Sequence, residues 1–229
     1  MQHTALDVPT VAAMIQAISY SQITPIVRVP SNDLYIINKA LDFGAHGVIV
    51  PLVNSREDAM KAVRSSRYAP KGMRSWGQRA SLRDPDYAST ANDELMVIPQ
   101  IETELAMQNL EEIVCTDGIQ AVFCGPFDLS MSLGVFRQFD NPKFVKALES
   151  IVSTCEAHGV APGLLARIGP VGQVIRQGFK LISLGGDLPM LSTSVARALE
   201  SAREAAKARR PTRERHRQTH GATVRKNRS

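Results

Sequence analysis

Short apolar, β-branched runs alternate with stretches of helical periodicity along most of the chain. Six of the runs have strand length and are almost continuously apolar: 25–29 (PIVRV), 47–52 (GVIVPL), 96–101 (MVIPQI), 119–124 (IQAVFC), 161–165 (APGLL) and 180–184 (KLISL). Continuous apolar runs are typical of parallel strands that are buried on both faces. The pattern therefore predicts a sheet of parallel strands.

The segments between these runs have helix length and helix-like starts. We expect helices over residues 8–19, 33–43, 55–66, 103–113, 142–158, 169–178 and 187–207. Asn32-Asp33 precedes the second of them, and Ser55 with Asp58 forms a pair resembling a capping box at the third. Strands that alternate with helices predict right-handed βαβ units.

Two architectures fit this alternation, an open doubly wound sheet and a (β/α)₈ TIM barrel. Neither GxGxxG nor GxxxxGK[ST] follows any strand, so the common phosphate loops of the open fold are not indicated. Polar residues instead follow several different strands, as they do in barrels, whose chemistry lies at the carboxyl ends of the strands. A barrel usually takes about 250 residues, so we expect one that is incomplete at its amino-terminal end.

Charge divides the chain into a body and a tail. Residues 203–229 hold ten Lys and Arg against two Glu, a net +8, whereas the rest holds 17 basic and 20 acidic residues, a net −3. We expect a barrel domain over residues 1–206 and a basic, disordered tail over 207–229. The tail could contact nucleic acid weakly, but the charge of the body argues against such a partner.

Composition narrows the location of the protein. No apolar run approaches the roughly 20 residues that span a bilayer, and the amino terminus does not resemble a signal peptide. Three cysteines are too few and too scattered for a disulfide framework or a zinc site. We expect a cytoplasmic protein without a membrane partner.

Carboxylates follow two successive strands. Glu102 directly follows the third run and Asp128 follows the fourth, so both could converge on Mg²⁺ or Mn²⁺, which prefer oxygen ligands. The Gly125-Pro126 turn would present the N–H groups of Phe127 and Asp128 to a carboxylate. The alternative is structural: Glu102 starts a helix and Asp128 caps a turn.

A positively charged side chain lies near the end of the first apolar run, 25–29. Arg28 lies in an apolar strand, where a charge must meet a carboxylate or face a polar cavity. Its planar guanidinium suits a carboxylate or an enolate oxygen, although an ordinary salt bridge explains it equally well. From its position near the terminus alone, His3 reads as a surface residue.

Five stretches together resemble the HpcH/HpaI aldolase family, metal-dependent pyruvate aldolases related to citrate lyase β-subunits. They are PIVRVPSND (25–33), LDFGAHGVIVPLVNSREDA (41–59), RYAPKGMRSWG (67–77), QIET (100–103) and GPFDLSMSLG (125–134). The resemblance reaches from residue 1 to about residue 205 and implies a TIM barrel of the phosphoenolpyruvate/pyruvate superfamily. Against that pattern we expect the first strand, the first helix and most of the second strand to be absent.

The resemblance also implies roles for the residues at the strand ends. Glu102 and Asp128 would bind the divalent cation, with Co²⁺ a further candidate beside Mg²⁺ and Mn²⁺. Arg28 would stabilise the pyruvate enolate, and the turn that begins at Gly125 would hold the pyruvate carboxylate. Gln100 would orient the metal or its bound water.

Two further assignments depend on the resemblance alone. His3 falls at the position of the family's proton-handling histidine, and Asp42 matches an acidic residue that the family directs toward a neighbouring subunit's active site. The family commonly forms hexamers of dimers that exchange their last helix, which implies a homo-oligomer.

The resulting hypothesis is a carbon–carbon lyase that reversibly cleaves a 4-hydroxy-2-oxo acid to pyruvate and an aldehyde, with oxaloacetate decarboxylation as a side reaction. Two alternatives remain open at this point. One is a citrate-lyase-like enzyme that acts on an acyl-CoA thioester. The other is a catalytically degenerate member that only binds a metal or a neighbouring subunit.

Overall fold

The computed structural model describes residues 1–77, 84–165 and 170–208, in two units, Met1–Leu184 and Gly185–Ser229. The first unit contains one sheet of six parallel strands that pair in chain order. The strands are β1 (Ile26–Arg28), β2 (Gly47–Val50), β3 (Met96–Ile101), β4 (Ala121–Cys124), β5 (Ala161–Leu165) and β6 (Leu181–Ser183). Each lies within one of the six predicted runs, so the predicted parallel sheet is confirmed.

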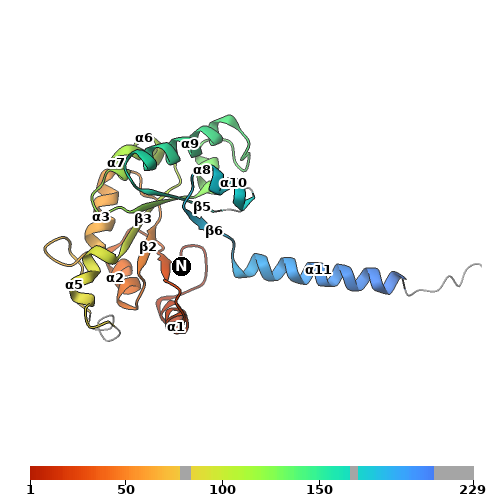
Figure 1. Ribbon diagram of the computed structural model, residues 1–229, viewed down its shortest axis with the longest axis horizontal. Helices are drawn as coiled ribbons and strands as arrows, with labels where there is room; N and C mark the ends of the chain where they lie inside the picture. Colours follow the sequence, from red (N-terminus) through yellow and green to blue (C-terminus); the bar gives the residue numbers. More distant parts are fainter. Residues whose placement is uncertain (78–83, 166–169, 209–229) are drawn as a thin grey trace, which may run out of the picture. The chain divides into compact units, whose positions relative to one another are not determined.

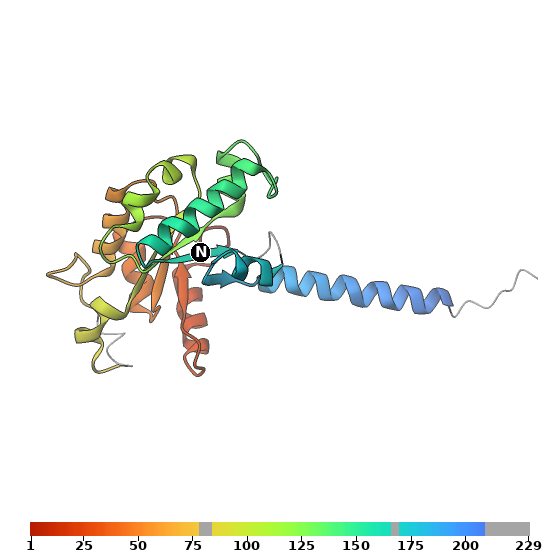
Figure 2. The same cartoon turned by 45° about the horizontal axis from the view of Figure 1, so that its top comes forward.

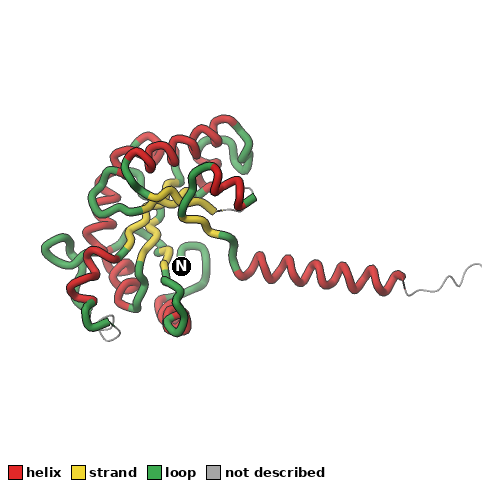
Figure 3. Tube along the Cα trace, in the orientation of Figure 1, coloured by secondary structure: helices red, strands yellow, loops and turns green. Residues whose placement is uncertain are grey.

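The sheet curls, and helices line its outer side (Figures 1 and 3). The helices of this unit are α1 (Val8–Ile18), α2 (Leu34–Asp42), α3 (Arg56–Ser66), α5 (Tyr87–Glu94), α6 (Glu104–Gln108), α7 (Leu110–Val114), α8 (Pro126–Ser132), α9 (Pro142–Ala157) and α10 (Val171–Arg176). The described residues thus form a half-barrel. They contain no further strand that would close the sheet into the complete (β/α)₈ barrel.

The core lies between the sheet and the helices on its outer side. In the sheet, Val48 of β2 pairs with Val97 of β3, and both side chains are fully buried. Helix α9 presents the apolar stripe expected from the sequence, with Phe144 and Ile151 completely buried. Burial of such side chains contributes about 1.5–3 kcal/mol each.

Local capping explains where two of the helices begin. The Asp33 carboxylate accepts hydrogen bonds from the N–H groups of Tyr35 and Ile36, which starts α2. The Ser55 hydroxyl accepts from the N–H of Asp58, which starts α3. These caps satisfy N–H groups that have no acceptor within the helix.

The structure differs from the predicted helices in three places. The helix expected over 103–113 is divided into α6 and α7 at Asn109, whose side-chain amide donates to the backbone carbonyl of Asn54 at 2.7 Å. Helix α5 was not predicted, because only Tyr87 and Ala91 in it are buried and the apolar pattern is weak. Helix α8 replaces the turn expected after Gly125.

The second unit contains helix α11 (Asp187–Ala208), which confirms the helix predicted over 187–207 (Figure 2). Of the basic, disordered tail predicted over 207–229, Lys207 and Ala208 belong to α11 instead, and residues 209–229 lie outside the described residues. Among the helices that are described, none has the length and apolar character needed to cross a membrane.

Candidate active site

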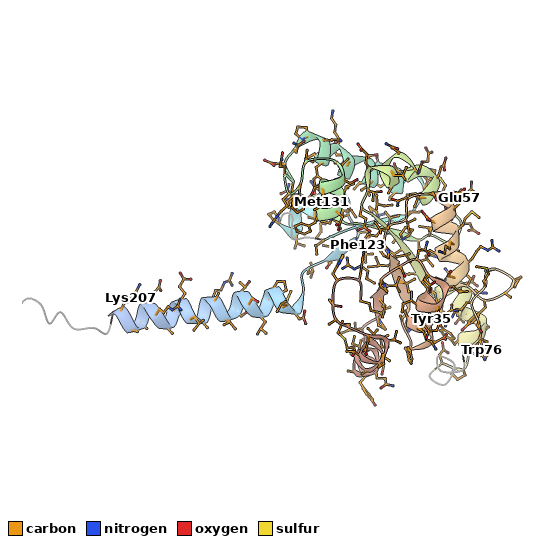
Figure 4. The ribbon with its side chains drawn as sticks, turned by 180° about the vertical axis from the view of Figure 1, so that it is seen from behind. Tyr35, Glu57, Trp76, Phe123, Met131 and Lys207 are labelled. Atoms are coloured by element: carbon orange, nitrogen blue, oxygen red, sulfur yellow. The ribbon has the colours of Figure 1, made fainter. Side chains whose placement is uncertain are left out.

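A cavity of about 570 Å³ opens at the carboxyl ends of the strands. Polar groups reach it from β1, from β3 and from the segment after β4. Its lining comprises His3, Ile26, Arg28, Ile49, Gln100, Phe123, Gly125, Pro126, Phe127, Asp128, Leu165, Leu181, Ile182 and Ser183. In Figure 4, Phe123 marks the region where the strands meet. The cavity therefore brings together seven of the residues singled out from the sequence: His3, Arg28, Gln100, Gly125, Pro126, Phe127 and Asp128.

Glu102 lies beside this cavity but is almost completely buried, with 2% of its surface exposed. One carboxylate oxygen accepts a 2.8 Å hydrogen bond from the N–H of Leu52, and the other accepts from the side-chain amide of Gln100. Burial raises the pKa of Glu102, and the nearby Asp128 carboxylate adds to the rise. The hydrogen bonds from Leu52 and Gln100 and the charge of Arg28 act against it.

Leu52 is a site residue that sequence reasoning missed. It has a φ of 54°, a left-handed conformation that leucine rarely adopts, and its side chain is 57% exposed. Such strain is concentrated at functional sites, and here it accompanies a backbone N–H donated to Glu102. Nothing in the residue type of Leu52 signals this, because a glycine would be the usual choice at a positive φ.

The segment after β4 forms the first turn of α8 rather than the isolated turn that was expected. Pro126 is the first helical residue, and Asp128 lies in the first turn. The first N–H groups of a helix have no acceptor within it, so those of Phe127 and Asp128 can serve a ligand as the prediction requires. Asp128 itself is exposed at the cavity.

Gly125 is required by close packing. A Cβ atom at this position would lie 2.8 Å from the Gln100 side-chain nitrogen and 2.9 Å from a Glu102 carboxylate oxygen. The missing side chain therefore lets the start of α8 approach the Gln100–Glu102 pair.

Arg28 and His3 line the same cavity. His3 is exposed, as its place near the terminus predicts, and its exposed side chain also lines this cavity. The amino group of Met1 donates to the carbonyl oxygen of Arg28 at 3.1 Å, which holds the segment with His3 beside β1. Arg28 is half-buried and has no ion pair among the described residues. The salt-bridge explanation for Arg28 is therefore the weaker one.

Asp42 does not line the cavity. It ends α2 and pairs with Arg74 at 2.9 Å, with 22% of its side chain exposed. Arg74 is the second residue that sequence reasoning did not single out for a role, because a contact across 32 positions leaves no local pattern.

The acidic groups at the cavity suit a hard divalent cation, although they do not enclose one. Glu102 and Asp128 supply carboxylate oxygens, and the carbonyl oxygen of the Gln100 side chain is buried without a hydrogen-bond partner. No group of three His, Cys, Asp or Glu side chains that could hold a metal occurs in the part of the chain that the structure describes. Two carboxylates are nevertheless a sufficient protein contribution for Mg²⁺ or Mn²⁺, which retain water or substrate oxygens.

These groups form one chemical arrangement. An arginine, a histidine and the start of a helix face the cavity, and a buried carboxylate lies behind it. The arginine and the helix N–H groups can bind a small anionic substrate, and the histidine can exchange a proton with it. A curled parallel sheet with polar groups at the carboxyl ends of its strands is the arrangement found in α/β-barrel enzymes.

Comparison with known proteins agrees with this class. Residues 2–194 match the HpcH/HpaI aldolase/citrate lyase family. A 5-keto-4-deoxy-D-glucarate aldolase of Escherichia fergusonii is 32% identical over 205 residues, which are 87% of this chain and 80% of the relative. The chain belongs to the HpcH/HpaI aldolase/citrate lyase family.

Solved structures of the family have the same fold. An HpcH/HpaI aldolase/citrate lyase family protein from Burkholderia cenocepacia J2315 superimposes with a TM-score of 0.80 at 30% identity, over 89% of this chain and 83% of that one. Macrophomate synthase superimposes with a TM-score of 0.82 at 28% identity, over 91% and 76%. The family and its named aldolases support a lyase.

Proposed function

We propose that this protein is a class II, divalent-metal-dependent pyruvate aldolase. It reversibly cleaves a 4-hydroxy-2-oxo acid to pyruvate and an aldehyde, and it decarboxylates oxaloacetate as a side reaction. The observation that carries the proposal is the cavity in which Arg28, Gln100, His3 and Asp128 meet beside the buried Glu102. The E. fergusonii relative, named for an aldolase reaction, supports the reaction class.

Substrate binding follows from the start of α8. The N–H groups of Phe127 and Asp128 hold the substrate carboxylate, since free N–H groups at a helix start favour anions. Gly125 leaves the room that this approach needs, because a side chain there would collide with Gln100 and Glu102. The apolar lining, which includes Ile49 and Phe123, excludes water from the reacting carbons.

Bond cleavage needs a base and a group that stabilises negative charge. His3 removes the proton from the 4-hydroxyl group, the C3–C4 bond breaks, and its electron pair becomes the pyruvate enolate. The Arg28 guanidinium stabilises the enolate oxygen through charge-assisted hydrogen bonds. The proton held by His3 then returns to C3, which yields pyruvate and restores the neutral histidine, while the former C4 leaves as the aldehyde carbon.

A Schiff-base mechanism is not supported. It would require a lysine at the reacting carbonyl, and none of the described residues that line the cavity is a lysine. This favours the metal-dependent class over the lysine-dependent one.

The metal is assigned to Glu102 and Asp128. Their carboxylates would hold Mg²⁺ or Mn²⁺, or Co²⁺, and Gln100 would orient Glu102 through its side-chain amide. When bound, such a cation polarises the 2-oxo group and neutralises part of the enolate charge. The raised pKa of Glu102 fits a carboxylate whose negative charge awaits a cation.

We further propose that the protein works in the cytoplasm as a homo-oligomer. The described cysteines are all free thiols, as is usual in reducing compartments. Helix α11 carries Leu188, Leu191, Val195 and Leu199 at helical spacing, a stripe that suits packing against another subunit. In such an assembly Asp42 would act at a neighbouring subunit's cavity.

The test is pyruvate release by the 229-residue chain from oxaloacetate and from a 4-hydroxy-2-oxo acid, with and without added Mn²⁺. Glu102→Gln is the matched control, because free metal alone decarboxylates oxaloacetate slowly. We expect release that depends on metal and is lost in the control. A folded chain that releases no more pyruvate than Glu102→Gln would contradict the proposal.

A further inference from the structure

Asn54 lies in the segment that follows β2, and all four of its polar groups have a hydrogen-bond partner. Its backbone N–H donates to the Asp58 carboxylate at 3.0 Å, and its carbonyl oxygen accepts from the side-chain amide of Asn109 at 2.7 Å. Its own side-chain amide donates to the carbonyl oxygen of Leu52 at 3.2 Å and accepts from the Thr103 hydroxyl. One half-buried residue therefore joins partners that lie up to 55 positions away.

The two side-chain hydrogen bonds of Asn54 close a ring that includes Glu102. Leu52 donates its backbone N–H to the Glu102 carboxylate at 2.8 Å, and Thr103 directly follows Glu102 in the chain. The ring runs from Glu102 through Leu52 and Asn54 to Thr103, which is joined covalently to Glu102. A fully satisfied network of this kind is rigid, so it fixes the end of β2 against the end of β3 and limits the rotation of the carboxylate.

The backbone of Asn54 is anchored to the neighbouring helices. Asp58 belongs to the first turn of α3, and Asn109 lies between α6 and α7. A strained backbone conformation persists only where the surrounding contacts hold it. The left-handed conformation of Leu52 lies two residues before Asn54, so these anchors hold the segment that presents the Leu52 N–H to Glu102.

The carboxamide of Asn54 supplies the donor and the acceptor that the ring requires. Aspartate could accept from the Thr103 hydroxyl but could not donate to the Leu52 carbonyl oxygen, and leucine could do neither. Asn54 is not among the described residues that line the cavity. An effect of Asn54 on the site must therefore pass through Glu102.

We infer that Asn54 is a positioning residue for the metal site: through the ring it holds the Glu102 carboxylate in the orientation in which this carboxylate binds a divalent cation. This inference rests on the proposed function, which assigns the cation to Glu102 and Asp128. Asn54 contacts neither the cation nor the substrate and adds no step to the reaction. Its loss weakens cation binding, because a carboxylate that is free to rotate must be ordered when the cation binds.

The experiment measures the binding of Mn²⁺ to the full chain by electron paramagnetic resonance, in which free aqueous Mn²⁺ gives a sharp signal that decreases on binding. The test variant is Asn54→Leu, which has nearly the size of asparagine and neither of its side-chain hydrogen bonds. Loss of a group that orients a metal ligand typically costs 10- to 100-fold in affinity, and Asn54 acts through one further bond, so we expect the dissociation constant to rise about 10-fold.

Pyruvate release from oxaloacetate gives a second measurement on the same variant. We expect Asn54→Leu to need more Mn²⁺ for half of its maximal rate, while its rate at saturating Mn²⁺ approaches that of the wild type. The reason is that Arg28 and His3 lie outside the ring and are unchanged. A change in the Mn²⁺ requirement without a change in the maximal rate indicates weaker cation binding.

Asn141→Ala is the matched control for a purely structural role. Asn141 caps α9 by accepting from the N–H of Lys143 at 3.0 Å, and it is not among the described residues that line the cavity. Removal of a helix cap lowers the stability of the fold. This variant should therefore melt at a lower temperature and retain the wild-type dissociation constant for Mn²⁺.

A second pair of variants tests the ring if Asn54→Leu does not fold. Thr103→Val removes the hydroxyl that donates to Asn54, and Thr103→Ser retains it. The same hydroxyl accepts from the N–H of Ala106 and caps α6, so Thr103→Val also loses stability, as Asn141→Ala does. We expect weaker Mn²⁺ binding in Thr103→Val and wild-type binding in Thr103→Ser. Asn54→Leu combined with Thr103→Val should bind no more weakly than the weaker single variant, because both open the same ring.

A folded Asn54→Leu or Thr103→Val that binds Mn²⁺ as tightly as the wild type would overturn the inference. An equal loss of affinity in Asn141→Ala would also contradict it, because Mn²⁺ binding would then follow the stability of the fold. A wild-type chain that leaves the signal of free Mn²⁺ unchanged would refute the metal assignment of the proposed function, and this inference with it.

Discussion

The backbone N–H of Leu52, just beyond β2, donates a 2.8 Å hydrogen bond to the Glu102 carboxylate at the end of β3. This bond joins neighbouring strand ends at the cavity and holds a buried anion in place. It depends on a left-handed backbone conformation at a leucine, with a φ of 54°. Local strain at one residue therefore accompanies the orientation of a carboxylate 50 positions away.

Two substitutions at Leu52 should distinguish the contribution of its backbone N–H group from the cost of its strained conformation. Leu52→Gly keeps the N–H and removes the strain of roughly 1–2 kcal/mol, while glycine's extra chain entropy costs about 0.5–1 kcal/mol. We expect its free energy of unfolding in urea to equal or slightly exceed that of the wild type. Leu52→Pro removes the N–H and cannot adopt a positive φ, so it should lose both stability and activity. Equal stability of the two variants would refute the role of this hydrogen bond.

Glu102 should make stability depend on pH in a defined direction. Burial raises its pKa in the folded chain above the unfolded value, so the protonated form is favoured on folding. The stabilising contribution of Glu102 to the free energy of unfolding is therefore present below the pKa of Glu102 in the unfolded chain. It is lost as the pH rises through the pKa of Glu102 in the folded chain. In the absence of metal, Glu102→Gln should therefore have a higher Tm than the wild type at pH 8, and the difference should shrink toward pH 4.

The hydrogen bonds around Glu102 can be retained in Glu102→Gln. Glutamine can still accept from Leu52, and Gln100 can rotate its amide so that its unpartnered carbonyl oxygen accepts from the new side chain. Thermal melts of both proteins with and without Mn²⁺ measure the effect. Added Mn²⁺ should raise the Tm of the wild type but not that of Glu102→Gln. A Tm difference that grows as the pH falls would contradict the assignment.

Gly125→Ala should be destabilising because its Cβ atom would lie within 3 Å of the Gln100–Glu102 pair. Overpacking of this kind costs about 1–3 kcal/mol, and here it also displaces the proposed metal ligand. Urea unfolding and pyruvate release measure the two losses. Gly172→Ala in α10 is the matched control, since its Cβ atom would meet only the end of the flexible Arg176 side chain at 3.4 Å. The control should be neutral or slightly stabilising.

The three cysteines should react at very different rates. Cys115 is exposed, whereas Cys124 and Cys155 are buried. Burial raises the pKa of the Cys124 thiol, and it raises that of Cys155 to about 12, so neither forms the reactive thiolate at neutral pH. A thiol reagent such as DTNB should modify one cysteine rapidly in the native protein and all three in urea. Rapid modification of Cys124 without urea would show that the sheet opens near the cavity.

Hydrophobic periodicity was sufficient to predict the main features of the fold. Burial between helix layers makes parallel strands nearly continuous in apolar residues, and each of the six strands lies within such a run. The helix caps at Asp33 and Ser55 could also be predicted from the sequence, because a cap involves residues only two or three positions apart. Helix α5 was missed because only Tyr87 and Ala91 in it are buried, which is too few for a readable period.

The candidate site was predictable only in part. The sequence predicted that Arg28, Gln100 and Asp128 lie at or just beyond the carboxyl ends of separate strands, and parallel strands end at one edge of the sheet. Their convergence on a single cavity, together with His3, depends on the curl of the sheet, which no local pattern expresses. The Arg74–Asp42 pair and the Leu52–Glu102 hydrogen bond join residues 32 and 50 positions apart. Such contacts form only when the whole chain packs. The sequence by itself therefore determined which chemical groups are available, and only the tertiary structure decided which of these groups lie next to one another.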